Sequence, residues 1–334
     1  MNAKDVKHLP GRPKTDKLDS VWLCKVGERQ MLRPSFVPPP EIRELRDLTR
    51  YRIDQVAVRT AEKQRVEKLL EDAQIKLSVV ASDIFGVSGR EMMAALNAGQ
   101  RDPKALAHMA RARLRVKMAD LEEAFYGSRF GDHHAFLLAK MLARVDTIDA
   151  DIADLEARIE QQIHQQGTLA RAVARLDSIP GVGVATAHVI LAEIGVDMAR
   201  FPTSAHLVSW AGFAPIVKES AGRAKGNNAT GHGNKYLARA LGDAAAAASK
   251  TDTFLGERYR RIARRRGKKK AIVAIGRSIL VIVWHLLTDP RAEFVDLGPD
   301  YHDTRRGAQR AIRSHVQHLQ ALGYQVTLHP TTAA

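Results

Sequence analysis

The sequence has little cysteine and few aromatic residues. A single cysteine, Cys24, occurs in 334 residues, which excludes an intramolecular disulfide and a zinc cluster built on cysteines. This usage fits a reducing cytoplasm. Aromatic residues make up only 5% of the chain, so base stacking is not expected to be its main means of binding nucleic acid. The 45% of hydrophobic residues predict an aliphatic core, in a chain long enough for two or three domains.

Long apolar segments are also scarce. The N-terminus is polar and basic, without the apolar core of a signal peptide. The most apolar run, 272–287, is interrupted by Arg277 and is too short to cross a bilayer. We therefore expect a buried helix there, and a cytoplasmic protein with no membrane partner.

Acidic residues are nearly missing from the segment 250–277, where positive charge is concentrated. Eleven basic residues there face only Asp252 and Glu257, a local charge of +9 in a chain of +15. Such a patch releases counterions from a polyanion and gives salt-sensitive affinity. A solvated helix face is the alternative for a short charge run, but the length of this one favours nucleic-acid binding. The candidate binding residues are Arg258, Arg260, Arg261, Arg264, Arg265, Arg266, Lys268, Lys269 and Lys270.

Helical spacing of apolar residues recurs over the first half of the chain. It runs through 41–77, with a turn predicted at Phe85–Arg90 and a new helix starting at Asp102-Pro103. From Leu138 to Ile163 the steps alternate between three and four, which is a heptad seam. This predicts a coiled coil, formed within one chain or between chains, with an ordinary amphipathic helix as the alternative. We expect the chain to form a homo-oligomer through this coiled coil. The seam residues are Leu138, Met141, Val145, Ile148, Ile152, Leu155, Ile159 and Gln162.

A glycine-containing turn, Ile179–Gly183, separates two segments of helical character. It is similar to the helix-hairpin-helix motif of DNA-binding proteins. The backbone N–H groups that open the second helix suit a phosphate oxygen, and glycine lets the backbone approach closely. Gly181 and Gly183 are therefore candidate phosphate contacts. A tight connection between helices is the alternative.

Ser220 lies in a polar loop, KESAGRAKGNNATGHGN, that is rich in glycine. Arg223 and Lys225 are close in sequence and suit the phosphate oxygens of a phosphodiester under attack by a serine. Most serines in such loops are turn residues. His232 is a candidate base, although an isolated loop histidine is usually not one.

Two acidic residues near the N-terminus, Asp16 and Asp19, are three apart. In a helix this spacing places both carboxylates on one face, where they are candidate Mg²⁺ ligands. A hard divalent ion needs further oxygen ligands, and a charge pattern at a helix N-terminus is the alternative. The proline-rich segment 34–40 predicts a stiff linker.

The order of these motifs resembles the IS110 family of bacterial insertion-sequence transposases. The resemblance rests on KTDKLDS, RPSFVPPPEIRELRDLTRYR, LDSIPGVGVATAHVILAEIG, WAGFAP, ESAGRAKG, GHGNKYLARAL and GERYRRIARRRGKKKAIVAIGRSILVIVWHLL. It implies an N-terminal RuvC-like domain with a DEDD carboxylate set that binds Mg²⁺, then a coiled coil and a C-terminal domain with a serine nucleophile. It also implies multimers acting on element-end and target DNA, guided by a structured RNA. By position, Ser220 corresponds to the nucleophile, and Asp16 and Asp19 to the third and fourth carboxylates.

The sequence departs from that pattern at its N-terminus. The first aspartate and the glutamate of the set belong before KTDKLDS, where only fifteen residues precede Asp16 and none is a glutamate. We therefore expect an N-terminally truncated transposase that is inactive alone. We expect it to associate with the nucleoid of a bacterial cell. A non-catalytic DNA/RNA-binding remnant and a helix-hairpin-helix DNA-binding protein are the alternatives.

The expected fold is mainly α. Its parts are a remnant of a RuvC-like α/β domain with the linker (1–40), a helical region ending in a coiled coil (41–168), a helical transposase domain with the helix-hairpin-helix-like turn (169–297), and a helix or strand extension (298–334).

Overall fold

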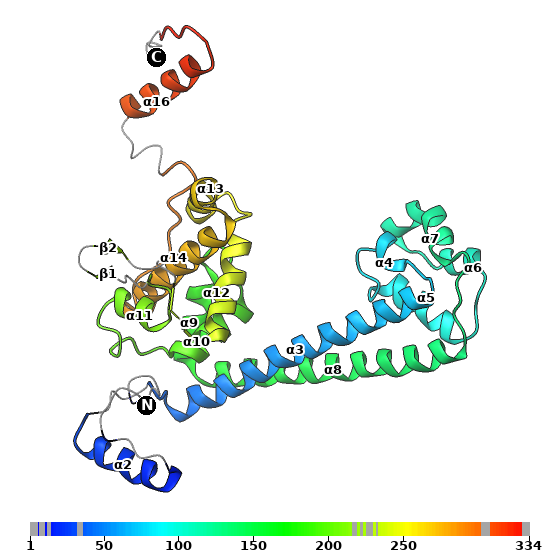
Figure 1. The fold of residues 1–334 in the computed structure, drawn as a ribbon, viewed down its shortest axis with the longest axis horizontal. Coiled ribbons are helices and arrows are strands. Elements are labelled where there is room, and N and C mark those ends of the chain that lie inside the picture. Colours follow the sequence, from blue (N-terminus) through cyan, green and yellow to red (C-terminus); the bar gives the residue numbers. More distant parts are fainter. Residues whose placement is uncertain are drawn as a thin grey trace. The chain divides into compact units, whose positions relative to one another are not determined.

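A computed structural model describes residues 6, 11, 15–31, 36–215, 219–220, 223–224, 230–231, 233–301 and 308–328. Helices dominate these residues (Figure 1), which confirms the mainly α fold. The chain divides into two units, Met1–Arg43 and Glu44–Ala334. The helices are α2 (Asp16–Glu28), α3 (Pro40–Asp72), α4 (Leu77–Val80), α5 (Val87–Asn97), α6 (Pro103–Ala107), η1 (Ala112–Lys117), α7 (Met118–Phe125), α8 (Asp132–Gln165), α9 (Gly167–Asp177), α10 (Val184–Ile194), α11 (Ser204–Trp210), α12 (Lys235–Ala248), α13 (Phe254–Arg266), α14 (Lys268–Thr288) and α16 (Ala308–Ala321).

Two long helices, α3 and α8, lie side by side in the second unit (Figure 1). Ion pairs join them, among them Arg59 Nη1 with Asp149 Oδ1 at 2.5 Å and the pair Arg52–Glu156. Six of the eight predicted seam residues of α8 are buried, while Met141 and Leu155 are half-buried. Most of the seam is thus already buried within one chain.

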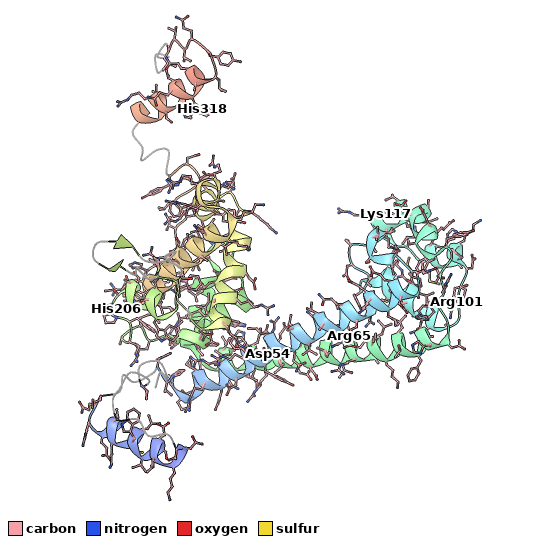
Figure 2. The ribbon with its side chains drawn as sticks, viewed as in Figure 1. Asp54, Arg65, Arg101, Lys117, His206 and His318 are labelled. Atoms are coloured by element: carbon pink, nitrogen blue, oxygen red, sulfur yellow. The ribbon has the colours of Figure 1, made fainter. Side chains whose placement is uncertain are left out.

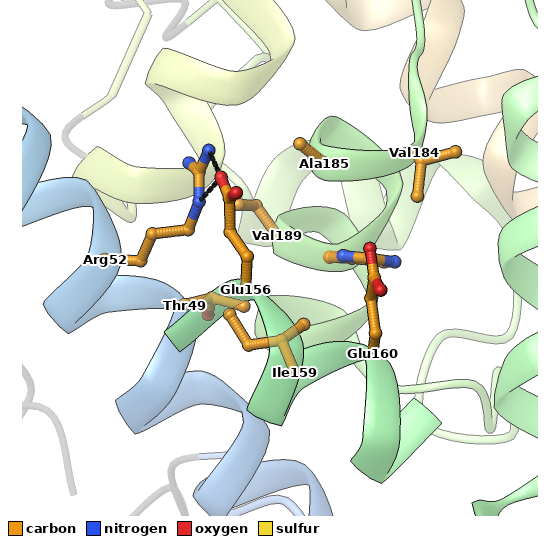
Figure 3. A pocket seen from close by; sticks show the side chains of 9 residues that line it. Thr49, Arg52, Glu156, Ile159, Glu160, Val184, Ala185 and Val189 are labelled. Carbon is orange, nitrogen blue, oxygen red and sulfur yellow. Dashed lines mark hydrogen bonds and ion pairs between the residues drawn. The ribbon is translucent and has the colours of Figure 1, made fainter. Parts of the chain in front are cut away.

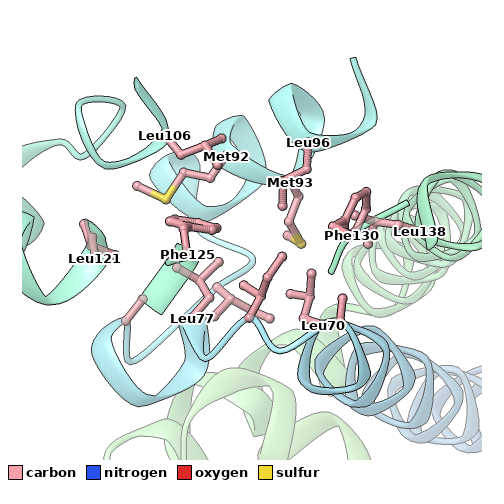
Figure 4. Close-up of a cluster of buried hydrophobic side chains, with 14 of the residues drawn as sticks. Leu70, Leu77, Met92, Met93, Leu96, Leu106, Leu121, Phe125, Phe130 and Leu138 are labelled. Atoms are coloured by element: carbon pink, nitrogen blue, oxygen red, sulfur yellow. The ribbon is translucent and has the colours of Figure 1, made fainter. Parts of the chain in front are cut away.

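A small helical cluster, α4 to α7, packs between the end of α3 and the start of α8 (Figure 4). Its core is mainly aliphatic, with two fully buried methionines, Met92 and Met93, and two buried phenylalanines, Phe125 and Phe130. The predicted turn at Phe85–Arg90 is wrong for its last four residues, because α5 already begins at Val87. Gly89 is a helix residue whose Cβ would lie 2.1 Å from the carbonyl oxygen of Ile84, so glycine serves close packing there. Asp102 caps α6 by accepting hydrogen bonds from Lys104 N and Ala105 N, as its place before proline predicts.

Helices α9 to α14 form a second helical cluster in which α14 is the core element. Helix α14 packs against α11, α12 and α13. With 21 residues it is long and apolar enough to cross a membrane by length and composition. The prediction that this apolar segment is too short to cross a bilayer is therefore wrong. The helix nevertheless buries Ile275, Ile279, Leu280 and Val283 within the cluster, as expected for the core helix of a globular domain.

Candidate nucleic-acid interface and serine hairpin

Ser220 lies in a short hairpin between α11 and α12. Strand β1 (Glu219–Ser220) pairs antiparallel with β2 (Arg223–Ala224), and Ser220 stands directly opposite Arg223. An isolated bridge, Pro215 with Thr230, closes the hairpin nearer its root. The structure describes the backbone of Ser220 and Arg223, whereas Lys225 and His232 lie outside the described residues. The register thus brings the candidate nucleophile and one candidate cation to facing positions.

Two glycines bring the ends of this hairpin together. Gly212 has a φ of +76°, and a Cβ there would lie 2.8 Å from Gly233 N. A Cβ at Gly233 would lie 2.1 Å from the carbonyl oxygen of Ala211. Only glycine tolerates such a close approach of two backbones, so these residues fix the root from which the Ser220 hairpin extends.

The root also rests on α14. It borders a cavity of about 160 Å³ lined by Phe213 and Thr230 and by Ile272 and Val273 of α14. A Cβ at Gly276 of α14 would lie 2.8 Å from Phe213 Cε1. Helix α14, which carries the end of the basic block, therefore contacts the root of the serine hairpin directly.

A buried carboxylate, Glu193, holds the chain at the end of the hairpin. Its side chain is completely buried in α10 and accepts hydrogen bonds from Arg50 Nε at 2.8 Å and Arg50 Nη2 at 2.9 Å. Arg46 Nε lies 3.3 Å from Oε2, and Asn234 Nδ2 donates to the same oxygen. The hydrogen bond to Glu193 raises the pKa of Arg50, whereas burial lowers the pKa of Arg46.

Asn234 connects this cluster to the serine hairpin. It follows the hairpin root directly, and its Oδ1 caps α12 by accepting from Tyr236 N at 2.9 Å. The hydroxyl of Tyr236 then donates to Asp54 of α3 at 3.2 Å, a residue labelled in Figure 2. Three helices, α3, α10 and α12, are thereby joined beside the root.

The glycine turn before α10 packs inward. Gly181 has a φ of +87°, and a Cβ there would lie 2.3 Å from Ala244 O and 2.6 Å from Ala248 N. The alanines of α12 thus admit the turn, and Gly181 serves helix packing. Gly183 is different, because nothing lies within 4 Å of its Cβ position. It precedes the open N-terminus of α10 and remains a candidate phosphate contact.

A cavity of about 220 Å³ lies beside that N-terminus (Figure 3). Val184 and Ala185 of α10 line it together with Glu156 and Glu160 of α8. Arg52 Nε donates to Glu156 at 2.8 Å, but Glu160 adds a second carboxylate to the wall. Because like charges repel, the two carboxylates make this cavity less suitable for a phosphate than the glycine turn alone suggests.

Two faces of α13 divide the basic block. On one face Arg260 pairs with Glu257 at 2.9 Å and with Asp252 at 3.1 Å. Arg264 Nη2 pairs with Glu257 at 3.1 Å. The two acids of the segment therefore neutralise Arg260 and Arg264. These two predicted binding residues have less positive charge to offer a nucleic acid.

The other face of α13 keeps its charge. Arg258 and Arg261 form no ion pair with any described residue, and the Nε atoms of both are buried without a hydrogen-bond partner in the structure. Burial lowers the pKa of Arg258, and the nearby charges of Arg261 and Arg277 lower it further. Arg265 and Arg266 and the lysines 268–270 are exposed at the junction of α13 and α14.

The candidate metal residues lie in the first unit. Asp16 and Asp19 occupy the first turn of α2, so the helix expected there is present. Among the described residues no group of three or more histidine, cysteine, aspartate or glutamate side chains is placed to hold a metal ion. Two carboxylates one turn apart do not supply the near-octahedral oxygen set of Mg²⁺, so these residues alone do not fit the ion.

The sequence reasoning missed four of the residues that build this region. It did not select Arg50, Glu193 or Asn234, and it counted Arg277 in the basic block without choosing it as a binding residue. A signal for Glu193 was present, because it is the one charge in the apolar run VILAEIG. A charge in such a run is expected to be buried with a partner.

Parts of the chain match known transposase families and a protein of an insertion element. Residues 173–260 match the model of the transposase IS116/IS110/IS902 family. Residues 1–75 match a transposase model for the DEDD proteins of IS110. The chain is also 40% identical over 116 residues to an uncharacterized 43.6 kDa protein of insertion element IS110 from Streptomyces coelicolor. That alignment covers 34% of this chain and 28% of the relative, so it spans less than a third of that protein.

Proposed function

Because the chain belongs to the IS110 family of transposases, we propose that it acts in DNA transposition by cleaving and rejoining strands through Ser220. The reaction would join the serine oxygen to a DNA phosphorus and release the 3′ or 5′ oxygen of the broken phosphodiester. Attack of a strand-end hydroxyl on that phosphorus would then restore the phosphodiester and free the serine. Phosphodiester bonds are exchanged at each step, so no oxidant or nucleotide cofactor is required.

The observation that carries this proposal is the register of the hairpin, with Ser220 opposite Arg223. Directly opposite residues of an antiparallel pair share one face. A guanidinium at that position suits the two non-bridging oxygens of the attacked phosphate and the charge that develops on them. Arg223 is accordingly proposed to stabilise the transition state.

We propose that DNA, at the element ends and at the target, is held by the unneutralised part of the basic block. The candidate contacts are Arg258, Arg261, Arg265, Arg266 and the lysines 268–270. Their support is the concentration of positive charge on one segment and the lack of ion pairs to Arg258 and Arg261 among the described residues. Arg260 and Arg264 contribute less, because Glu257 binds both.

The divalent metal usual for DEDD transposases is proposed to be Mg²⁺, with Asp16 and Asp19 as two of its ligands. When bound, the ion would neutralise charge on the phosphate. Asp16 and Asp19 would contribute carboxylate oxygens from one face of α2. Further oxygen ligands are required, because two carboxylates do not complete an Mg²⁺ site.

The remaining partners follow the family resemblance. We propose a homo-oligomer, a structured guide RNA and association with the nucleoid. The covered seam of α8 argues that chains associate through another surface, or by exchanging the α3–α8 hairpin, because Ile152 and Ile159 are already buried. The alternative function is that of a non-catalytic nucleic-acid-binding protein that joins multimers of the transposase.

Covalent trapping tests the catalytic proposal. The chain is mixed with Mg²⁺, element-end DNA and a complete family member whose own nucleophilic serine has been replaced by alanine. We expect a denaturant-resistant DNA adduct of the 36.9 kDa chain. The adduct should vanish with Ser220→Ala and persist with Ser209→Ala, a substitution on α11. An adduct that survives Ser220→Ala would refute the assignment.

A further inference from the structure

Three arginines, two on α13 and one on α14, lie on these two packed helices. Arg258 and Arg261 are three residues apart on α13 and therefore lie on one face. Arg277 projects from α14, the helix against which α13 packs. Arg258 lies near both Arg261 and Arg277, because their charges add to burial in lowering its pKa. Arg258 and Arg261 are half-buried, whereas Arg277 is exposed.

This cluster is electrostatically incomplete. Arginine stays charged, and buried charges are normally paired. Here the Nε atoms of Arg258 and Arg261 are both shielded from solvent and lack any hydrogen-bond acceptor. No described carboxylate pairs with any of the three arginines, although Arg260 on the same helix has two such partners. Keeping three like charges together costs free energy that a bound anion would recover.

We infer that Arg258, Arg261 and Arg277 form a preformed site for one phosphate group of a nucleic-acid backbone. This inference rests on the proposed function and adds to it a defined site with a residue of α14 that the charge run did not single out. Each guanidinium presents a planar fork that matches phosphate oxygens. Arg277 is exposed and offers the accessible edge of the site, while Arg258 and Arg261 add positive charge that no described carboxylate neutralises.

The position of the site connects it with the serine hairpin. Arg277 follows Gly276, whose Cβ position is 2.8 Å from Phe213 Cε1 at the hairpin root. A phosphate held by Arg277 would therefore be bound to the same helix that supports Ser220. The site would fix the backbone of a strand near the hairpin, whereas the exposed lysines 268–270 would add diffuse attraction.

Salt-dependent binding of a DNA duplex measures how many phosphates the cluster neutralises. The slope of log K against log salt falls by about 0.9 for each lost phosphate contact. We expect the triple variant Arg258→Gln, Arg261→Gln, Arg277→Gln to lower the slope by about 0.9, as for one phosphate, and not by about 2.7, as for three separate contacts. Arg277→Gln alone should already produce most of this loss. The matched control is Arg260→Gln, which removes the same charge from a paired arginine and should change the slope less.

A second measurement does not depend on how the variants fold. In the wild-type chain, the Nε–Hε nuclear magnetic resonance signals of Arg258 and Arg261 should shift saturably with inorganic phosphate at constant ionic strength, while that of Arg260 should not. Linear shifts, or equal shifts at all three, would overturn the inference. The same titration with matched DNA and RNA oligonucleotides shows which backbone occupies the site.

The outcomes separate the inference from the proposed function. If the wild-type chain binds duplex but Arg277→Gln behaves like Arg260→Gln, the three-arginine site is refuted and DNA binding stands. If the wild-type chain binds neither duplex nor RNA, the proposed function fails. The three arginines could then still bind inorganic phosphate saturably, but their ligand would not be a nucleic acid.

Discussion

Glu193 and Arg50, 143 residues apart in the chain, form a two-pronged ion pair with N–O distances of 2.8 and 2.9 Å. The carboxylate is completely buried, whereas the Arg50 side chain is 34% exposed. The pair binds α3 to α10, and Asn234 extends it to the N-cap of α12 beside the serine hairpin. The position of the root of the serine hairpin thus depends on an ion pair between α3 and α10.

Removing Arg50 tests this relationship. Arg50→Ala leaves the Glu193 carboxylate buried with Arg46 and Asn234 only, and we expect a loss of roughly 3 kcal/mol in the free energy of unfolding. The matched control is Arg52→Ala, which breaks a more exposed pair with Glu156 and should cost under about 1 kcal/mol. Urea denaturation measures both. Equal effects would show that Glu193 does not depend on Arg50.

The seam of α8 yields a second prediction. Ile152→Asp places a charge at a side chain that is only 5% exposed, so the chain should lose roughly 3 kcal/mol or more in the free energy of unfolding. Asp154→Ala on the exposed side of α8 is the control and should change little. Circular dichroism melting reports the stability, and sedimentation reports the mass. A fully stable variant with a reduced mass would instead indicate a seam between chains.

Much of this architecture is predictable from local sequence, whereas the partners of two buried positions are not. The heptads, the Asp102-Pro103 start and the helix around Asp16 all follow from neighbouring residues. The neutralisation of Arg260 and Arg264 follows from the spacing to Glu257. By contrast, the partner of Glu193 lies on a distant helix, and the neighbours of Gly181 are backbone atoms of α12. Contacts of that kind depend on tertiary packing, which periodicity and composition do not encode.

The two glycines of the predicted phosphate turn should respond differently to alanine. Gly181→Ala forces a Cβ to 2.3 Å from Ala244 O at a positive φ, so we expect a loss of roughly 3 kcal/mol or more. Gly183→Ala has open space and a φ of −89° and should leave thermal stability nearly unchanged. Thermal unfolding distinguishes them. Weaker DNA binding by a stable Gly183→Ala variant would support a phosphate contact at the α10 N-terminus.

His188 predicts a pH effect on stability. Burial lowers its pKa below the ordinary value near 6.5, and Arg52 and His164 act in the same direction while Glu160 opposes them. The unfolded chain therefore binds a proton more readily than the folded chain. The contribution is fully present above about pH 6.5 and is lost as the pH falls toward the lowered pKa, by at most about 1.4 kcal/mol per pH unit. Urea unfolding at pH 7.5 and 5.5 should show a smaller loss for His188→Gln than for the wild-type chain. An equal loss would assign the effect to other groups.

The most direct measurement is to locate the residue that becomes attached to DNA. The trapped adduct of the wild-type chain, formed with Mg²⁺, element-end DNA and the serine-less complete relative, is digested with nuclease and protease and analysed by mass spectrometry. The account predicts that the peptide containing Ser220 carries the residual nucleotide phosphate. A nucleotide on Ser204 or Ser209, or no attached nucleotide while the relative and the chain remain bound to the DNA, would contradict it.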